Sequence, residues 1–341
     1  MPKSHYKTLE VDPKASKEVI SAAYRTLAAN HSTNDRILKR INAAYEVVGD
    51  DDKRSQYDKM KSVGKKIGGY RILEAIAEGG FGVTYKAKHE ETGGIVCIKH
   101  ASNVSSLDEQ LLIDEANACW DLRHWGIPCM RDILRFSDGS LGLVMSYIEG
   151  ATIGEILQMK KYETGLDPEH VAWMTERILN TMKYLHLNGV IHGDIKPQNI
   201  IIQNTDHTAV LVDYGLSLVK PKKNDGAKGY TPFFAAPEQA EGKPLLPEAD
   251  FYGLGMTMIF ALGGDVEHIK VPDNTPDAMC GLIKKFIKRN PLSRPNWSKE
   301  DLCDTIAKIR KKDFKRRNSG MKPLEIDQKE LLEIRENNKG D

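Results

Sequence analysis

The order in which strand-forming and helix-forming segments follow one another most constrains the fold of this chain. Three short segments rich in β-branched and alternating apolar residues lie close together: Tyr70–Ala77, Val83–His89 and Ile95–His100. After Gly150 the pattern becomes helical, with one clear helix that is capped by Asp167 and ended by Gly189. A strand-rich block of about 80 residues therefore precedes a helix-rich block of about 160 residues, and this order predicts an α+β fold in two lobes.

The N-terminal residues 1–61 have a different pattern, which predicts a small all-α unit. Ser16 can cap a first helix, and a second helix is expected after Asn34 and Asp35. Apolar side chains recur at helical spacing on both: Ile20, Ala23, Tyr24 and Leu27 on the first, and Ile37, Ile41, Ala44, Tyr45 and Val48 on the second. Two such helices joined by a short turn are expected to pack antiparallel. The glycine-containing residues 62–69 predict a linker to the strands.

Composition excludes several classes of protein. The 341 residues are 40% apolar and 28% charged, and the net charge is +1, so no overall field favours a nucleic-acid partner. The five cysteines include no CxxC pair, which favours free thiols over a metal site. The N-terminus lacks the apolar core of a signal peptide, and no run approaches the ~18 apolar residues of a membrane span. We therefore expect a cytoplasmic protein without a membrane span.

Two features of the strand-rich block indicate a site for an anion. A glycine-rich turn, residues 78–82, separates the first two strands, and glycines let backbone N–H groups approach phosphate oxygens closely. A tight hairpin that binds nothing would have the same composition, so the glycine-rich turn alone does not identify a phosphate site. Lys99 ends the third apolar strand, where an ammonium group needs an anionic partner unless it faces water at a strand edge. Glu115, on a helix expected over Asp108–Leu122, is a candidate partner.

The densest polar cluster follows the long helix, in residues 191–199. It places Asp194, Lys196 and Asn199 between two apolar runs, and burying such groups together is costly unless they have a function. Asp213 ends a later apolar stretch. Asp213 and Asn199 are suitable ligands for a hard cation such as Mg²⁺, and Asp194 could position a hydroxyl group.

In this order and spacing, these residues resemble the eukaryotic-type protein kinase family over Tyr70 to about Lys312. The resemblance implies a bilobal kinase fold with an N-lobe at 70–148, a C-lobe at 149–312 and a charged tail at 313–341. It implies ATP and Mg²⁺ as cofactors and a protein substrate as acceptor. By this resemblance, Lys99 holds the α- and β-phosphates, Asp194 is the catalytic aspartate, and Lys196 steadies the γ-phosphate.

The resemblance also assigns sets of site residues. The ATP-binding set is Ala77, Gly79, Gly80, Gly82, Thr84, Lys99, Glu115, Met145 (the gatekeeper) and Tyr147. The catalytic set is Asp194, Lys196 and Asn199, and the metal ligands are Asn199 and Asp213. In the activation segment and on the substrate side, Thr231 faces the substrate and Arg294 pairs with Glu238. Gly193 stands where the family often has an arginine that reads an activation-loop phosphate, so we expect no requirement for such a phosphate.

Residues 4–60 resemble the J domain of DnaJ-type co-chaperones through motifs such as His5-Tyr6, Ala23-Tyr24-Arg25 and Tyr57-Asp58. The family's functional turn is His-Pro-Asp, and the corresponding segment here reads His31-Ser32-Thr33-Asn34-Asp35. The proline is absent, and the histidine and aspartate are out of register. We therefore expect a docking module at 1–61, possible for a chaperone or another protein, without normal stimulation of a chaperone ATPase.

Taken together, the sequence predicts an ATP-dependent serine/threonine protein kinase with an N-terminal docking module. Two alternatives stay open. A pseudokinase scaffold would bind nucleotide and present the helical module without transferring phosphate. The second alternative is a small-molecule kinase, because His-Gly-Asp also occurs in kinases that modify aminoglycosides and choline. At the C-terminal end, residues 327–337 predict a loosely attached helix.

Overall fold

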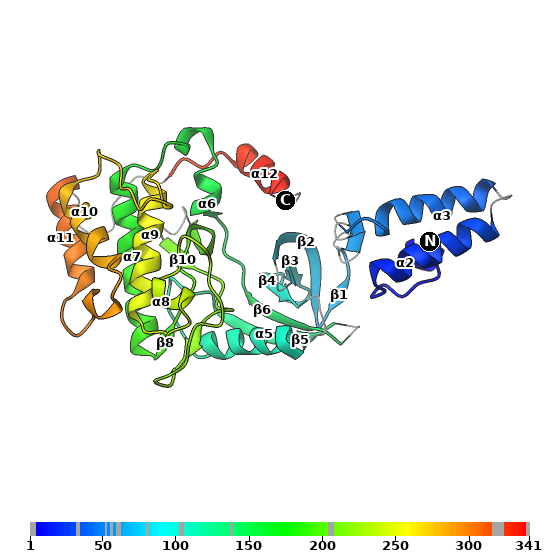
Figure 1. Ribbon diagram of the computed structural model, residues 1–341, viewed down its shortest axis with the longest axis horizontal. Coiled ribbons are helices and arrows are strands. Elements are labelled where there is room, and N and C mark those ends of the chain that lie inside the picture. The colour runs from blue at the N-terminus through cyan, green and yellow to red at the C-terminus, as the bar shows by residue number, and fades with distance from the viewer. Residues whose placement is uncertain are drawn as a thin grey trace.

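The computed structural model describes residues 5–31, 35–51, 53–54, 57–58, 63–79, 82–101, 106–136, 139–203, 208–315 and 324–338. Figure 1 shows three units along the long axis: an N-terminal helical unit, a sheet in the middle and a larger helical lobe. This arrangement has the mixed α/β character that the sequence predicts, with the strands and helices largely segregated.

The N-terminal unit consists of α1 (His5–Thr8), α2 (Lys17–Asn30) and α3 (Asp35–Val48). Helices α2 and α3 lie side by side (Figure 1), and Ser16 caps α2 through a hydrogen bond from the backbone of Val19. The unit has its own buried core, made of Tyr6, Leu9, Ile20, Ile41, Ala44 and Val48. Much of the predicted apolar stripe is therefore buried, whereas Ile37 is exposed. The expected turn residues Ser32, Thr33 and Asn34 lie outside the described residues.

Arg54 holds the ends of this unit together. Its guanidinium donates to the hydroxyl of Tyr6 at 3.0 Å and to the backbone oxygens of Pro13 and Ala15 at 2.9 and 2.8 Å. The Tyr6 hydroxyl in turn donates to the Asp58 carboxylate at 2.6 Å. The hydrogen bonds of one planar cation thus join residues 6–15 to Arg54, which lies 39 to 48 residues further along the sequence.

The central sheet has six antiparallel strands in the order β1-β2-β3-β4-β6-β5. These are β1 (Lys66–Ile67), β2 (Tyr70–Gly79), β3 (Gly82–His89), β4 (Ile95–His100), β5 (Met130–Arg135) and β6 (Leu141–Ser146). One face buries a compact apolar cluster that includes Ile72, Tyr85, Val96, Ile98 and Val144. Helix α5 (Ser106–Cys119) contacts β6 and lies beside the sheet (Figure 1). Within the expected linker 62–69, β1 pairs with the start of β2, so the sheet begins before Tyr70.

The helical lobe is built around α7 (Pro168–Leu187) and α9 (Glu248–Ala261). Asp167 accepts a hydrogen bond from the backbone of Glu169 and caps α7, and Pro168 occupies its first turn. Helix α9 is buried on nearly all sides, as expected for a helix that is apolar around its whole circumference. The remaining helices are α6 (Ile153–Ile156), α8 (Pro237–Ala240), α10 (Asp277–Phe286), α11 (Leu302–Phe314) and α12 (Gln328–Asn337).

Short strands and 3-10 turns connect these helices and carry the loops of the site. Strands β7 (Ala151–Thr152), β9 (Ile200–Gln203) and β10 (Thr208–Leu211) form one small sheet, and β8 (Val190–Ile191) pairs with β11 (Leu218–Val219). The 3-10 turns are η1 (Lys160–Tyr162), η2 (Pro197–Asn199) and η3 (Pro291–Ser293). The polar segment 191–199 therefore runs between β8 and β9, which hold both of its ends.

A buried ion pair joins Glu238, at the end of the predicted activation segment, to Arg294 in the helical lobe. Arg294 contacts both carboxylate oxygens of Glu238, at 2.5 and 2.8 Å, and the Arg294 side chain is 0% exposed. Its other N–H groups donate to the backbone oxygens of Lys288, Arg289 and Glu248. Breaking such a pair by removing one partner typically costs ~3–5 kcal/mol, because the other charge is left buried and unpaired.

The helix expected to be loosely attached at 327–337 is in fact packed against the helical lobe. Asp327 caps α12, and Leu331 and Ile334 are 3% and 8% exposed. The expectation of loose attachment was wrong because the short segment shows only two core-facing positions, and the polar contacts that fix the helix come from distant residues. Within the described residues, no helix combines the length and apolarity needed to span a bilayer.

Candidate active site

A cavity of about 260 Å³ lies between the sheet and the helical lobe, next to the segment that connects them. Residues from both lobes line it: Ile76, Ala77, Thr84, Cys97, Lys99, Glu115, Pro128, Met145, Ser146, Tyr147, Ile148, Thr152, Gln198, Asn199, Ile201, Val212 and Asp213. Nine of these side chains are apolar or aromatic, and eight are polar or charged. Apolar walls with polar groups among them suit an organic ligand that also carries charge.

The register of the sheet explains why predicted residues from three strands meet on the roof of this cavity. Ala77 pairs with Thr84 across β2 and β3, and Thr84 pairs with Lys99 across β3 and β4. Side chains at directly paired positions lie on the same face of a sheet. The three side chains therefore form one row, and the gatekeeper position Met145 lies opposite Cys97 on the next strand.

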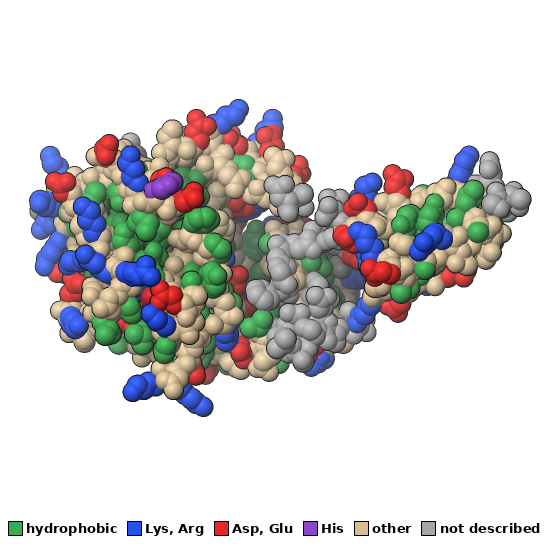
Figure 2. All heavy atoms as spheres, in the orientation of Figure 1, with side chains coloured by type: hydrophobic (Ala, Val, Ile, Leu, Met, Phe, Trp, Pro, Cys, Tyr) green, Lys and Arg blue, Asp and Glu red, His purple; other side chains and the backbone are tan. Residues whose placement is uncertain are grey.

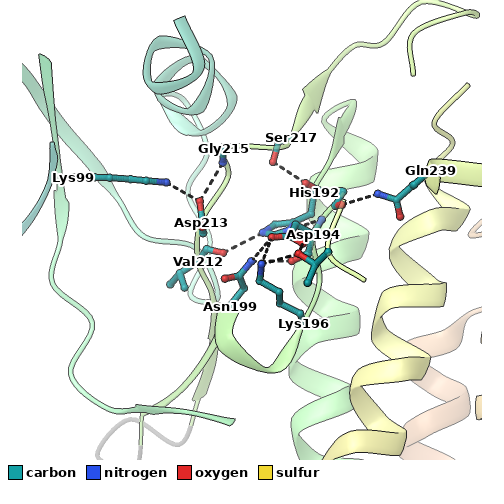
Figure 3. A network of polar contacts seen from close by, with 12 residues as sticks. Lys99, His192, Asp194, Lys196, Asn199, Val212, Asp213, Gly215, Ser217 and Gln239 are labelled. Atoms are coloured by element: carbon teal, nitrogen blue, oxygen red, sulfur yellow. Dashed lines mark hydrogen bonds and ion pairs between the residues drawn. The ribbon is translucent and has the colours of Figure 1, made fainter. Parts of the chain in front are cut away.

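Lys99 is the ionic centre of the site (Figure 3). Its Nζ lies 2.7 Å from Glu115 Oε2 and 2.7 Å from Asp213 Oδ1, so one ammonium joins a strand, helix α5 and the segment after β10. The Glu115 side chain is 2% exposed, and its second oxygen accepts a hydrogen bond from the backbone of Tyr214 at 3.2 Å. The predicted pairing of Lys99 with Glu115 is therefore present in the structure.

Burial and ion pairing act against each other in this triad. Burial by itself would lower the pKa of Lys99, but the two carboxylates outweigh it and raise that pKa above its ordinary value. For Asp213, burial would raise the pKa, and Lys99 lowers it below the ordinary value. For Glu115, burial is the largest influence and raises the pKa in spite of Lys99. Lys99 thus opposes the rise that burial causes in the pKa of Glu115.

The backbone at Asp213 has an unusual conformation, with φ at +65°. Such left-handed residues cost free energy unless they are glycine, and they are concentrated at functional sites. Gly215 follows two residues later, and its N–H donates to Asp213 Oδ1 at 3.4 Å. A Cβ atom on Gly215 would meet Asp213, Lys99 and Glu115 at 3.4 to 3.8 Å, which is ordinary van der Waals contact, so Gly215 lies directly beside the triad.

Asp194, Lys196 and Asn199 converge on a second centre, visible in Figure 3. Asp194 Oδ2 lies 2.7 Å from Lys196 Nζ and accepts a hydrogen bond from Asn199 Nδ2 at 3.0 Å. The hydroxyl of Thr231 donates to Asp194 Oδ1 at 2.6 Å and accepts from Lys196 Nζ at 2.8 Å. The site therefore holds a hydroxyl group between a carboxylate and an ammonium.

The loop that carries Asp194 is held from below by one buried carboxylate, that of Asp250 at the start of α9. Asp250 accepts from the backbone N–H groups of His192 and Gly193 at 2.9 and 2.8 Å, and from His186 Nε2 at 2.8 Å. Burial would raise the pKa of Asp250, and these hydrogen bonds outweigh it and lower that pKa. Trp297, which can only donate, contacts His186 Nδ1, so the proton of the neutral His186 ring lies on Nε2.

The two predicted metal ligands are compatible with a hard cation. Asn199 uses its amide nitrogen for Asp194, donating to both the backbone oxygen and the carboxylate, which leaves the amide oxygen available as a ligand. Asp213 is ionised, and one of its oxygens contacts Lys99. Both residues line the same cavity. An amide oxygen and a carboxylate are donors that Mg²⁺ accepts.

The segment from Asp213 to Gln239, which includes the predicted activation segment, contacts the loop that carries Asp194 and also contacts helix α5. Ser217 donates to the backbone oxygen of His192 at 3.1 Å, and Gln239 donates to that of Gly193 at 2.8 Å (Figure 3). Further along the segment, Lys228 Nζ lies 2.8 Å from Asp114 Oδ2 on α5. Asp114 directly precedes Glu115, so this ion pair links the activation segment to the helix that positions Lys99.

The structure places the predicted glycines at the tip of the hairpin between β2 and β3. Gly79 pairs with Gly82, and neither is among the residues that line the cavity. Gly80 lies outside the described residues. The sequence alone did not reveal His186, Gln239 or the pair of Lys228 with Asp114. A helix-end histidine or a surface lysine carries no local signal of its partner, which only the fold brings close.

Comparison with known proteins agrees with this geometry. The family model described as protein kinase domain matches residues 70–328, which is most of the chain, and that described as DnaJ domain matches residues 4–58. The chain therefore belongs to the protein kinase family and carries a DnaJ domain at its N-terminus. The two-lobed fold around residues 70–328 and the three N-terminal helices are the structural counterparts of these two matches.

Several kinases resemble this chain at moderate identity. Serine/threonine-protein kinase D of Synechocystis sp. is 32% identical over 211 residues, which cover 57% of this chain and 40% of that protein. Serine/threonine-protein kinase pkn3 of Myxococcus xanthus is 28% identical over 274 residues, 70% of this chain and 50% of that protein. Maternal embryonic leucine zipper kinase of Danio rerio is 27% identical over 254 residues, 73% and 36% of the two chains. The chain spans half or less of the length of these relatives.

The balance of burial and ion pairing at Glu115 generates a prediction about pH. In Lys99→Met the carboxylate keeps its burial but loses its cation, so its folded-state pKa rises further above the ordinary 4.5. A raised folded-state pKa gives stability that is complete below the unfolded-state pKa and is lost as pH rises through the folded-state pKa. The free energy of unfolding of Lys99→Met should therefore fall as the pH rises above the ordinary pKa of 4.5, and more steeply than that of the wild type.

Equilibrium denaturation at a series of pH values measures this slope. Lys86→Met is the matched control, because Lys86 also lies on the sheet but pairs with the exposed Glu74 at 3.5 Å. Its curve should run parallel to that of the wild type. Parallel curves for Lys99→Met as well would show that Glu115 does not depend on Lys99 for its ionisation.

Proposed function

We propose that this chain is an ATP-dependent serine/threonine protein kinase that transfers the γ-phosphate of ATP to hydroxyl groups of protein substrates. The observation that carries the proposal is the hydroxyl of Thr231 between Asp194 and Lys196. A substrate hydroxyl held by the same two groups would have its proton directed at a carboxylate and its oxygen beside a cation. That is the arrangement that a phosphoryl acceptor requires.

Each residue of the cavity has a role that follows from its chemistry. Asp194 orients the acceptor hydroxyl and can receive its proton, since Asn199 and Lys196 hold its carboxylate in place. Lys99, fixed by Glu115, presents a positive charge to phosphate oxygens at the roof of the cavity. Tyr147 and Met145, with their apolar neighbours, would receive the adenine ring. Catalysis of phosphoryl transfer rests mainly on positioning and charge neutralisation, which these residues can supply.

Mg²⁺ is the metal that we propose, held by Asn199 and Asp213. When bound, it would supply positive charge to the phosphate oxygens and lower the repulsion that opposes transfer. We infer serine or threonine as the acceptor from Lys196, by the family resemblance, and from the similarity to the serine/threonine-protein kinases of Synechocystis sp. and Myxococcus xanthus.

Two features argue against the alternative functions. A pseudokinase scaffold needs no intact ion pair at Lys99 and no ordered Asp194, yet both are present with good geometry. A small-molecule kinase needs no protein-binding segment near Asp194, whereas here Thr231 belongs to a segment that ends at the buried pair of Glu238 with Arg294.

Phosphate transfer from labelled ATP to generic serine/threonine protein substrates tests the proposal. Asp194→Asn should lower the rate by at least ~10²-fold, because the amide can neither receive the proton nor balance Lys196. Asp304→Asn is the control, since Asp304 is exposed on α11, far along the sequence from the site residues, and forms an ion pair with the exposed Lys308. Chelation of Mg²⁺ should stop the reaction and its return should restore it. ATP binding without transfer would favour the scaffold, and label on an added aminoglycoside or choline would favour the small-molecule kinase.

We further propose that the activation segment needs no phosphate to reach its active position. Gly193 has φ at +77°, a conformation that an arginine side chain would strain, so no cation stands there to bind a phosphate. Instead, the ion pair of Lys228 with Asp114 links the activation segment directly to helix α5. The two side chains are 22% and 33% exposed. Gln110 donates to the other oxygen of Asp114 at 2.8 Å and fixes its orientation.

A charge swap tests this link in phosphatase-treated protein. Lys228→Asp and Asp114→Lys should each lower kcat/KM by about fivefold to tenfold, because like charges then face each other. The double variant should recover most of the loss. Lys223→Asp, a change of the same charge at an exposed position of the same segment, should have little effect. Loss of wild-type activity on phosphatase treatment would contradict the proposal.

For the N-terminal unit we propose a docking role in which it binds another protein without stimulating a chaperone ATPase. The unit can act independently, because its core of six buried residues is separate from the cores of the kinase domain. The departure of residues 31–35 from His-Pro-Asp supports the absence of stimulation.

An ATPase assay with the fragment 1–61 and an Hsp70-type chaperone tests this role. The wild-type fragment should leave the ATPase rate unchanged, whereas Ser32→Pro combined with Thr33→Asp, which restores the sequence His-Pro-Asp, should raise it. A functional J domain provides the positive control. Stimulation by the wild-type fragment at micromolar concentration would overturn the proposal.

A further inference from the structure

Helix α12 is an addition to the part of the chain that matches the kinase family. The match ends at residue 328, and α12 runs over Gln328–Asn337. In Figure 1 this helix, drawn in red, lies beside α6, on the side of the helical lobe that faces the sheet. It therefore sits close to the segment that connects the two lobes.

Apolar and polar contacts hold the segment 324–338 firmly in this position. Leu324, Leu331 and Ile334 are buried in the core of the helical lobe. The Glu330 carboxylate accepts from the backbone of Lys160 at 2.9 Å, and the hydroxyl of Tyr162 contacts both the backbone N–H and the backbone oxygen of Glu325, at 3.0 and 3.3 Å. Because η1 holds the start of α12, the side chains in the last turn of α12 have a fixed position.

Arg335, in that last turn, makes three hydrogen bonds to the connecting region. Its Nε and one terminal nitrogen donate to the two carboxylate oxygens of Glu155, at 2.6 and 3.2 Å. The same terminal nitrogen donates to the backbone oxygen of Gly150 at 2.7 Å. The Arg335 side chain is 32% exposed and that of Glu155 is 16% exposed, so water only partly screens these charge-assisted bonds.

Both partners of Arg335 are connected to residues that line the cavity. Glu155 forms a capping box with Thr152, accepting from the Thr152 backbone at 2.7 Å, and Thr152 lines the cavity. Gly150 ends the segment whose residues Tyr147 and Ile148 also line it. At Gly150, φ is +157° and a Cβ atom would lie 2.2 Å from the backbone oxygen of Ile202, so only glycine allows the chain to pass there.

We propose that Arg335 is a positioning residue for nucleotide binding, and that α12 fixes the backbone of residues 147–152 in the conformation that receives the nucleotide. This inference rests on the proposed function, in that ATP is taken as the ligand of the cavity. Arg335 is not among the described residues that line the cavity, and it acts through Gly150 and Glu155. A lysine at this position would keep the charge but could not bond to the carboxylate and the carbonyl with the same planar group.

The test compares ATP affinity, measured by calorimetry, with turnover in the full chain. Arg335→Ala should raise the Kd for ATP by about tenfold, ~1.4 kcal/mol, while kcat at saturating ATP stays within about twofold. Arg335→Lys should recover only part of the affinity. Glu155→Gln, which can keep the capping box but loses the ion pair, should weaken ATP binding in the same direction. Amide hydrogen exchange at residues 147–152 should be faster in Arg335→Ala.

Lys329→Ala is the matched control, because it removes a positive charge from the exposed face of α12 and should leave ATP affinity unchanged. If Arg335→Ala lowers the thermal midpoint but binds ATP as tightly as the wild type, α12 is only an anchor and the inference fails. If the wild type binds ATP but transfers no phosphate, the proposed activity fails while the comparison of affinities still decides the role of Arg335. A wild type that binds no ATP would overturn both.

Discussion

One largely buried ammonium, that of Lys99, joins the two lobes by ion pairs at the cavity, beside an apolar core that both lobes share. Its two carboxylate partners come from helix α5 and from the turn after β10, so the ion pairs fix the position of one lobe relative to the other. Burial opposes ionisation most strongly at Glu115, whose side chain is 2% exposed, whereas that of Asp213 is 42% exposed, so Lys99 matters most for Glu115. The left-handed backbone at Asp213 accompanies a carboxylate that lies 2.7 Å from Lys99.

The sequence predicted those parts of the molecule whose hydrophobic pattern and polar residues indicate the same structure within a short stretch of chain. The strands of the N-lobe, the capped helix α7 and the cluster around Asp194 each carry a signal within a few residues, either in hydrophobic period or in the cost of burying charge. The position of Asp250 is an intermediate case. Its place at the start of an apolar helix is evident in the sequence, but its three hydrogen bonds to His186, His192 and Gly193 emerge only when two distant segments meet.

Contacts across long stretches of chain could not be predicted, because nothing near either residue indicates the other. Arg335 and Glu155 are 180 residues apart, and Lys228 and Asp114 are 114 residues apart. A short amphipathic segment such as 327–337 offers only two buried positions, so its apolar pattern understates how firmly it is attached. Charged side chains are spread over the face seen in Figure 2 with both signs intermixed, so the presence of charge alone does not identify the few pairs that matter.

The separate core of the N-terminal unit has a consequence for how this chain can change over generations. Among the described residues, Tyr6, Ile20 and Ile41 lie in a buried cluster separate from the two clusters of the kinase domain, so their contribution to stability should add to that of the kinase domain without coupling to it. Substitutions within this small core should therefore leave the kinase fold unaffected, and the reverse should also hold. What the helical unit recognises can thus change independently of the site around Lys99 and Asp194.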